Sequence, residues 1–190
     1  PYTLMFTISG LIRRPEEKIA YEEHFLADVC KNEFTKIKLT DALPDHPGAA
    51  GKLIKILRSA WPEASNYWKN IPAGAYQDLF FITKPEKTKR FIDAMKDICG
   101  KHSYEFDKLG IYQQPIEHNR ACQLQFSFFY DPADAAAVEE VKAIYDAAFE
   151  KMLELGGYFT RPYGNMAERL YERAGSYTAA LKKVKELFDP

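Results

Sequence analysis

Alternation of apolar and polar side chains predicts the strands of this chain. The pattern is clearest in residues 121–132. One face there carries Cys122, Leu124, Phe126, Phe128 and Tyr130, and the other carries Gln123, Gln125 and Ser127. Residues 2–12 alternate in the same way, and residues 35–40, 75–83 and 106–118 are predicted as further strands. These strands would bury one face of a sheet.

Apolar side chains three and four positions apart predict the helices. The predicted helices cover residues 15–34, 49–60, 85–102, 131–157 and 165–190. Pro15 and Pro85 suit helix starts, and Gly156 and Gly157 suit a helix end. Gly175 is a candidate break in the last helix. Residues 61–74 combine prolines, a glycine and polar side chains, which is typical of a loop.

The order of these elements is β-α-β-α-β-α-β-β-α-α. It favours an α+β domain with a mostly antiparallel sheet and helices packed on one face, related to ferredoxin-like layouts. A length of 190 residues fits one domain with a sizeable core, residues 1–190. The chain begins at Pro1 and ends at Pro190, so we expect the native polypeptide to be longer.

Composition excludes several classes of function. The chain is 46% hydrophobic and 28% charged with a formal net charge of -1, so bulk charge attracts neither nucleic acid nor an anionic membrane. No apolar run reaches the roughly 18 residues of a membrane span. The three cysteines form no CxxC pair and the four histidines lack metal-ligand spacing, so we expect no disulfide framework, no metal site and a cytoplasmic setting.

The connector GGYFTRPYGN, residues 156–165, carries more side chain than a link between two helices needs. Arg161 offers a fixed positive fork that suits a carboxylate, a phenolate or a reduced flavin. Tyr158 and Tyr163 add phenolic hydroxyls and flat apolar faces. A packed corner between two helices, with Arg161 on a surface carboxylate, explains the same residues equally well.

A second candidate is QQPIEHNRAC, residues 113–122, which joins two predicted strands. Gln114, His118 and Arg120 provide donors, acceptors and one group that titrates near neutral pH. An exposed hairpin turn is the simpler interpretation. Neither candidate identifies a cofactor, and the chain has no Gly-rich nucleotide-binding motif.

Residues 120–175 and the closing LKKVKELFDP resemble the C-terminal part of FAD-linked oxidases. The order of a strand ending in FFYDP, a long helix ending in glycines and an aromatic-Arg segment is most similar to the vanillyl-alcohol oxidase and p-cresol methylhydroxylase family. The resemblance implies an FAD-dependent oxidoreductase in which this chain is the cap domain, inactive by itself. An FAD-binding domain would precede it in cis and hold most of the FAD.

The resemblance also implies roles for particular residues. Arg161 would stabilise negative charge on the reduced flavin or on a phenolate-like substrate, with Tyr158 and Tyr163 as catalytic neighbours. Thr160 stands where the phenol oxidases usually carry Tyr, and it is expected to contact substrate or cofactor.

Further contacts are implied for residues outside the connector. Arg120 matches an Arg near the start of the preceding strand, with His118 beside it and Gln114 before them. Tyr76 lies roughly where some relatives attach flavin covalently. The substrate would be small and aromatic or phenolic; an electron-acceptor protein and a homo-oligomer are possible partners.

Two alternative functions fit the same sequence. The chain could be a standalone ferredoxin-like module that binds a ligand or dimerises without catalysis. It could also belong to the branch of the superfamily that oxidises 2-hydroxy acids, although the His- and Gly-rich motifs of that branch are absent from EHNRACQLQF and YFTRPYG.

Overall fold

The computed structural model describes residues 3–4, 7–34, 36–40, 69 and 72–189. The chain divides into two units, Pro1–Glu63 and Ala64–Pro190, and each is described by itself. The predicted helix 49–60 and most of the predicted loop 61–74 lie outside the described residues.

In the first unit, the predicted helix at Pro15 is confirmed as α1, Pro15–Glu33. The predicted strands at 2–12 and 35–40 are wrong, because the described residues of both segments are not in strands. An alternating pattern supplies an apolar face, but a strand also needs a hydrogen-bonded neighbour and a core to cover that face. Leu11 and Ile37 instead remain more than half exposed.

The second unit is built on an antiparallel sheet with the order β1-β3-β2. Its strands are β1, Ala75–Thr83; β2, Gly110–Ile116; and β3, Ala121–Tyr130. All three were predicted from the sequence, β3 from its alternation of apolar and polar side chains. β2 begins later than the expected residue 106 because Phe106–Lys108 forms a 3-10 turn, η3, before it.

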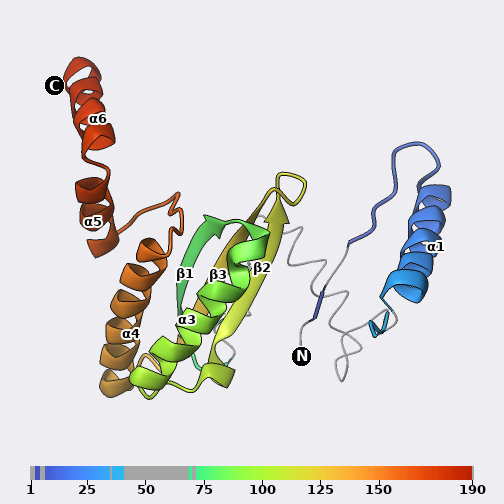
Figure 1. Cartoon of the computed structure of the whole chain (residues 1–190), viewed down its shortest axis with the longest axis horizontal. Helices are drawn as coiled ribbons and strands as arrows, with labels where there is room; N and C mark the ends of the chain where they lie inside the picture. Colours follow the sequence, from blue (N-terminus) through green and yellow to red (C-terminus); the bar gives the residue numbers. More distant parts are fainter. Residues whose placement is uncertain (1–2, 5–6, 35, 41–68, 70–71, 190) are drawn as a thin grey trace. The chain divides into compact units, whose positions relative to one another are not determined.

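Two helices cover one face of this sheet (Figure 1): α3, Thr88–Lys101, and α4, Ala135–Glu154. A short 3-10 turn, η2, Pro85–Lys87, leads into α3. Asp134 caps α4, since its carboxylate accepts hydrogen bonds from the backbone N–H groups of Ala136 and Ala137. The core between helices and sheet includes Leu79, Phe81, Phe91, Met95, Leu124, Phe126, Phe128, Ile144, Phe149 and Met152. The predicted α+β class, with helices on one face, is confirmed.

The last helical segment is divided, as the sequence predicted. It forms α5, Asn165–Arg173, and α6, Gly175–Phe188. The break lies at Ala174, whose backbone leaves the helical region with φ -97° and ψ 41°, while Gly175 begins the next helix. None of the described helices is long and apolar enough to cross a membrane.

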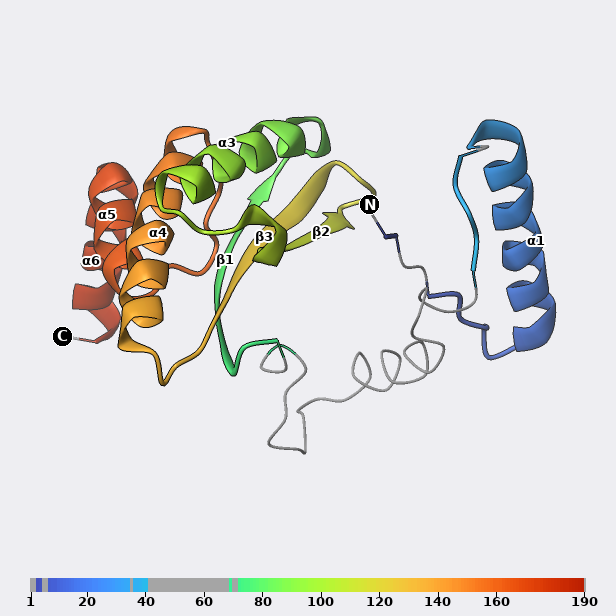
Figure 2. The same cartoon turned by 90° about the horizontal axis from the view of Figure 1, so that it is seen from below.

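The order β1-α3-β2-β3-α4 is the ferredoxin-like arrangement without its final strand. Figure 2 shows α3 and α4 on the same side of the sheet. The chain that leaves α4 returns to β1, where Tyr158 forms an isolated antiparallel bridge with Ile82. The connector therefore occupies the edge of β1 at which a fourth strand would pair.

Candidate functional site

A depression of about 250 Å³ lies where the connector meets β1 and β3. Thr160 and Arg161 of the connector form one side of it. The strands contribute Asp78, Phe80, Phe81, Ile82, Gln123 and Gln125. The register pairs Phe80 with Gln125 and Ile82 with Gln123, so these four side chains share the face of the sheet opposite the helices. The depression therefore joins the edge of β1 to the sheet face that α3 and α4 leave uncovered.

The path of the connector is fixed first by its glycines. Gly156 ends α4 with φ +88°, a conformation that favours glycine. Gly157 then passes so close to β1 that a Cβ atom there would lie 2.9 Å from Cδ2 of Phe81. The backbone next pairs with β1: the Ile82 N–H donates to the Tyr158 carbonyl at 2.8 Å, and the Tyr158 N–H donates to the Ile82 carbonyl at 2.9 Å.

Phe159 anchors the same segment in the core. Its side chain is 8% exposed, and its ring centroid lies 5.4 Å from that of Phe81 and 5.0 Å from that of Phe149. Successive side chains of extended backbone point to opposite sides. Burial of Phe159 therefore leaves Tyr158 exposed and places Thr160 at the depression.

Arg161 is exposed at the side of the depression. Within the described part of the chain, no carboxylate lies within ion-pair distance of its guanidinium. Among the described residues, Arg161 is therefore not paired with a surface carboxylate, which was the alternative explanation of this connector. The depression therefore has a positive charge on one side.

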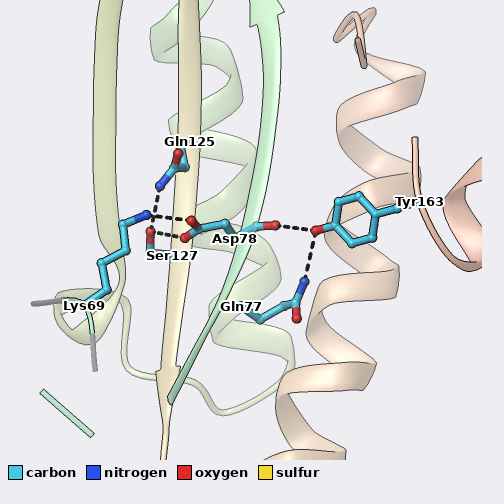
Figure 3. Close-up of polar contacts among 6 residues, drawn as sticks. All are labelled: Lys69, Gln77, Asp78, Gln125, Ser127 and Tyr163. Carbon is cyan, nitrogen blue, oxygen red and sulfur yellow. Dashed lines mark hydrogen bonds and ion pairs between the residues drawn. The ribbon is translucent and has the colours of Figure 1, made fainter. Parts of the chain in front are cut away.

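Tyr163 closes the connector on β1 through its hydroxyl. That oxygen lies 3.0 Å from the backbone carbonyl of Asp78 and 3.1 Å from Nε2 of Gln77 (Figure 3). It also lies 3.0 Å from the hydroxyl of Tyr145. The Tyr145 hydroxyl also lies 3.3 Å from Sδ of Met166. Burial, and then the hydrogen bond to Tyr163, raise the pKa of the Tyr145 hydroxyl, which therefore stays protonated.

A charged network lies beside the depression on the same sheet face (Figure 3). Nζ of Lys69 lies 2.6 Å from Oδ2 of Asp78, and the Ser127 hydroxyl donates to Oδ1 of Asp78 at 2.6 Å. Nε2 of Gln125 donates to Ser127 at 3.2 Å. The side chains of Lys69 and Asp78 are only 11% and 20% exposed. The network satisfies the charge of Asp78 and orients Gln125, which lines the depression.

The other predicted site residues lie outside the depression. Tyr76 lies in β1, with its ring centroid 5.0 Å from Nζ of Lys69. Gln114 is exposed in β2, opposite Gln123. His118 and Arg120 are exposed in the turn between β2 and β3, where His118 has φ +54°. Their roles in binding remain predictions, whereas Thr160 and Arg161 share one site with Tyr158 and Tyr163 nearby on the connector.

Sequence reasoning missed the residues that strands contribute to this site. Asp78 stands in the middle of the apolar stretch AYQDLFFIT, and a carboxylate at such a position is a signal of a paired, partly buried charge. Gln125 and Ser127 were assigned to the polar face of β3, yet they are only 9% and 5% exposed. No local pattern reveals that Lys69 lies over that face.

Comparison with known protein families gives a match over most of the chain. The family model described as "FAD linked oxidases, C-terminal domain" matches residues 7–190. No curated protein and no solved structure matches the chain significantly. The match covers both described units, including the strands, the connector and the residues around the depression. The chain belongs to the family of FAD-linked oxidase C-terminal domains.

Proposed function

We propose that this chain is the cap domain of an FAD-dependent oxidoreductase and that the depression beside β1 faces the flavin and a small aromatic or phenolic substrate. The observation that carries the proposal is Arg161, an exposed guanidinium in the depression without a carboxylate partner among the described residues. A preorganised cation stabilises charge that develops during reaction more effectively than water does. Family membership supplies the oxidoreductase context.

The residues around the depression suit a planar ligand with one polar edge. Phe80 and Ile82 offer apolar surface, while Gln123, Gln125 and Thr160 offer hydrogen-bond donors and acceptors beside Arg161. Ligand pockets usually measure roughly 300–1,000 Å³, so a depression of about 250 Å³ suits a small ligand and a second surface that completes the enclosure. An FAD-binding domain in cis is the expected second surface.

The same residues fit the ring of FAD better than its pyrophosphate. A single arginine with amide and hydroxyl groups can contact the polar edge of a flavin ring. A pyrophosphate is usually held by a Gly-rich turn at a helix N-terminus, and the sequence has no such motif. The flavin would accept the hydride, and the residues of this chain would orient the substrate and balance its charge.

The first test is a visible absorption spectrum of the protein expressed with its upstream sequence. A flavin spectrum that bleaches anaerobically when substrate is added measures hydride transfer without knowledge of the electron acceptor. A panel of 4-alkylphenols and 2-hydroxy acids separates the phenol-oxidase assignment from the hydroxy-acid alternative. We expect bleaching with a phenol.

Arg161→Ala should slow this bleaching by about 100-fold or more while flavin is retained, because a cation that stabilises developing charge typically contributes at least about 2.7 kcal/mol. Arg90→Ala is the matched control, since Arg90 is exposed in α3 and does not line the depression. Equal bleaching rates in the two variants would show that Arg161 does not act in the reaction. A colourless protein would favour the binding or dimerisation module instead.

A further inference from the structure

The hydrogen-bond capacity of the Tyr163 hydroxyl is fully used by the protein. A hydroxyl has one proton to donate and two lone pairs that accept. The Asp78 carbonyl can only accept, so Tyr163 donates its proton there. Nε2 of Gln77 can only donate, so it takes one lone pair. The Tyr145 hydroxyl has one proton and two acceptors in reach, the Tyr163 oxygen at 3.0 Å and Sδ of Met166 at 3.3 Å. Thioether sulfur is the weaker acceptor, so this proton goes to the remaining lone pair of Tyr163.

The full set of hydrogen bonds limits the role of the Tyr163 hydroxyl. With its proton on Asp78 and both lone pairs occupied, the hydroxyl has no direction left for a ligand. Burial of Tyr145 raises the pKa of its hydroxyl, so Tyr145 keeps the proton that it donates to Tyr163. Tyr163 is suited to hold the backbone in place and is poorly suited to exchange a proton with substrate.

Arg161 lies between two attachments of the connector to one strand. Before it, Tyr158 pairs with Ile82; after it, Tyr163 binds the carbonyl of Asp78. These two positions in β1 are about 13 Å apart, from a rise of about 3.3 Å per residue. Pro162, between Arg161 and Tyr163, fixes its own φ near about -65° and stiffens the short link.

We propose that Tyr163 is a positioning residue, held by Gln77 and Tyr145, that fixes Arg161 at the depression. This inference rests on the proposed function and deepens it, because it assigns the second tyrosine of the connector to geometry and leaves charge stabilisation to Arg161. The hydrogen bonds of Tyr163 connect separate elements of the fold. Gln77 and Asp78 lie in β1, Tyr145 lies in α4, and Tyr163 lies just before α5.

A double-mutant cycle on the full-length flavoprotein tests this proposal. The probe is benzoate, a planar aromatic anion, and its binding is followed by the change in flavin absorbance. Tyr163→Phe keeps the ring and removes the hydroxyl. We expect Arg161→Ala to weaken benzoate binding about tenfold or more, because it removes the charged partner of the carboxylate. We expect Tyr163→Phe to weaken binding about tenfold, because Arg161 is then no longer held at the depression. The double variant should bind no more weakly than Arg161→Ala alone.

Two controls separate positioning from general destabilisation. Tyr177→Phe makes the same chemical change at an exposed tyrosine of α6 and should leave benzoate affinity unchanged. Gln77→Met keeps a side chain of similar volume and removes one hydrogen bond to the Tyr163 hydroxyl. It should lower benzoate affinity by less than Tyr163→Phe does. Gln77→Met also keeps the test available if Tyr163→Phe fails to fold.

The outcomes are decisive in each direction. Unchanged affinity in Tyr163→Phe, or a loss that adds fully to that of Arg161→Ala, overturns the positioning role. If Arg161→Ala itself leaves benzoate binding unchanged, the proposed function fails, and amide hydrogen exchange decides the inference alone. Exchange at residues 158–161 should then rise about tenfold in Tyr163→Phe and stay constant in Tyr177→Phe; equal exchange in both variants refutes the anchor.

Discussion

At the scale of single residues, burial decides what a charge pair contributes. Lys69 and Asp78 form their ion pair at 2.6 Å with side chains that are 11% and 20% exposed. Lys89 and Asp93 form one at the same 2.6 Å with side chains that are 84% and 60% exposed. Water screens the second pair and competes for its partners, whereas the first pair also includes the hydroxyl of Ser127.

This contrast gives a matched prediction. Asp78→Asn should lower the free energy of unfolding by about 2–4 kcal/mol, because it removes the charge that Lys69 pairs with in a partly buried place. Asp93→Asn should change it by less than about 0.5 kcal/mol. Urea denaturation of both variants measures the difference. Similar losses of unfolding free energy in the two variants would mean that water screens the Lys69–Asp78 pair as strongly as a surface pair.

At the scale of elements, the join between α4 and β1 depends on the absence of a side chain at Gly157. A Cβ atom there would lie 2.9 Å from Cδ2 of Phe81 and 3.0 Å from the carbonyl oxygen of Met152. The sequence indicated only that glycines end the helix. The close approach adds a second reason for glycine: it lets the connector reach the edge of β1 and pair with Ile82.

Gly157→Ala should therefore destabilise the protein by about 1–3 kcal/mol, since the added methyl group meets the buried ring of Phe81. Gly100→Ala is the opposite case, because Gly100 lies in α3 and an added Cβ would meet no neighbouring side chain or packed segment within 4 Å. That variant should stabilise by about 0.5–1 kcal/mol through helix propensity. Thermal or urea denaturation tests the pair, and effects of the same sign would contradict this account of the join.

At the scale of the whole molecule, the core predicts how stability depends on pH. Burial is the main cause that raises the pKa of the Cys99 thiol from 9.0 to about 11. The folded protein therefore keeps this proton between pH 9 and about 11, while the unfolded chain releases it. Stability from this group is fully present below pH 9 and is lost as pH rises toward about 11. Burial also raises the pKa values of Cys122 and Tyr104, which act in the same direction.

We expect the free energy of unfolding to fall between pH 9 and about 11, by about 2–3 kcal/mol for Cys99 alone. Urea denaturation at several pH values measures the fall. Cys99→Ala should reduce its size, whereas Cys30→Ala, at a partly exposed position of α1, should leave it unchanged. An identical pH profile in both variants would show that Cys99 does not contribute.

The sequence by itself determined the elements whose signals are local. Alternation in residues 121–132 identified β3, and the spacing of apolar residues with Gly156 identified α4 and its end. Those signals suffice because strand and helix periods are set by the backbone over a few residues. The same reasoning failed at residues 2–12 and 35–40, because pairing partners and a core are not encoded in a segment alone.

Only the tertiary structure decided which residues form the site. The sequence pointed to Arg161 and Thr160, but it did not place them beside Asp78 of β1 and Gln125 of β3, which both precede α4 in the chain. It also left the role of Tyr163 undetermined, since that role follows from the hydroxyl's contact with the Asp78 carbonyl. Such contacts arise when the chain after α4 returns to the open edge of β1, and local periodicity carries no information about that return.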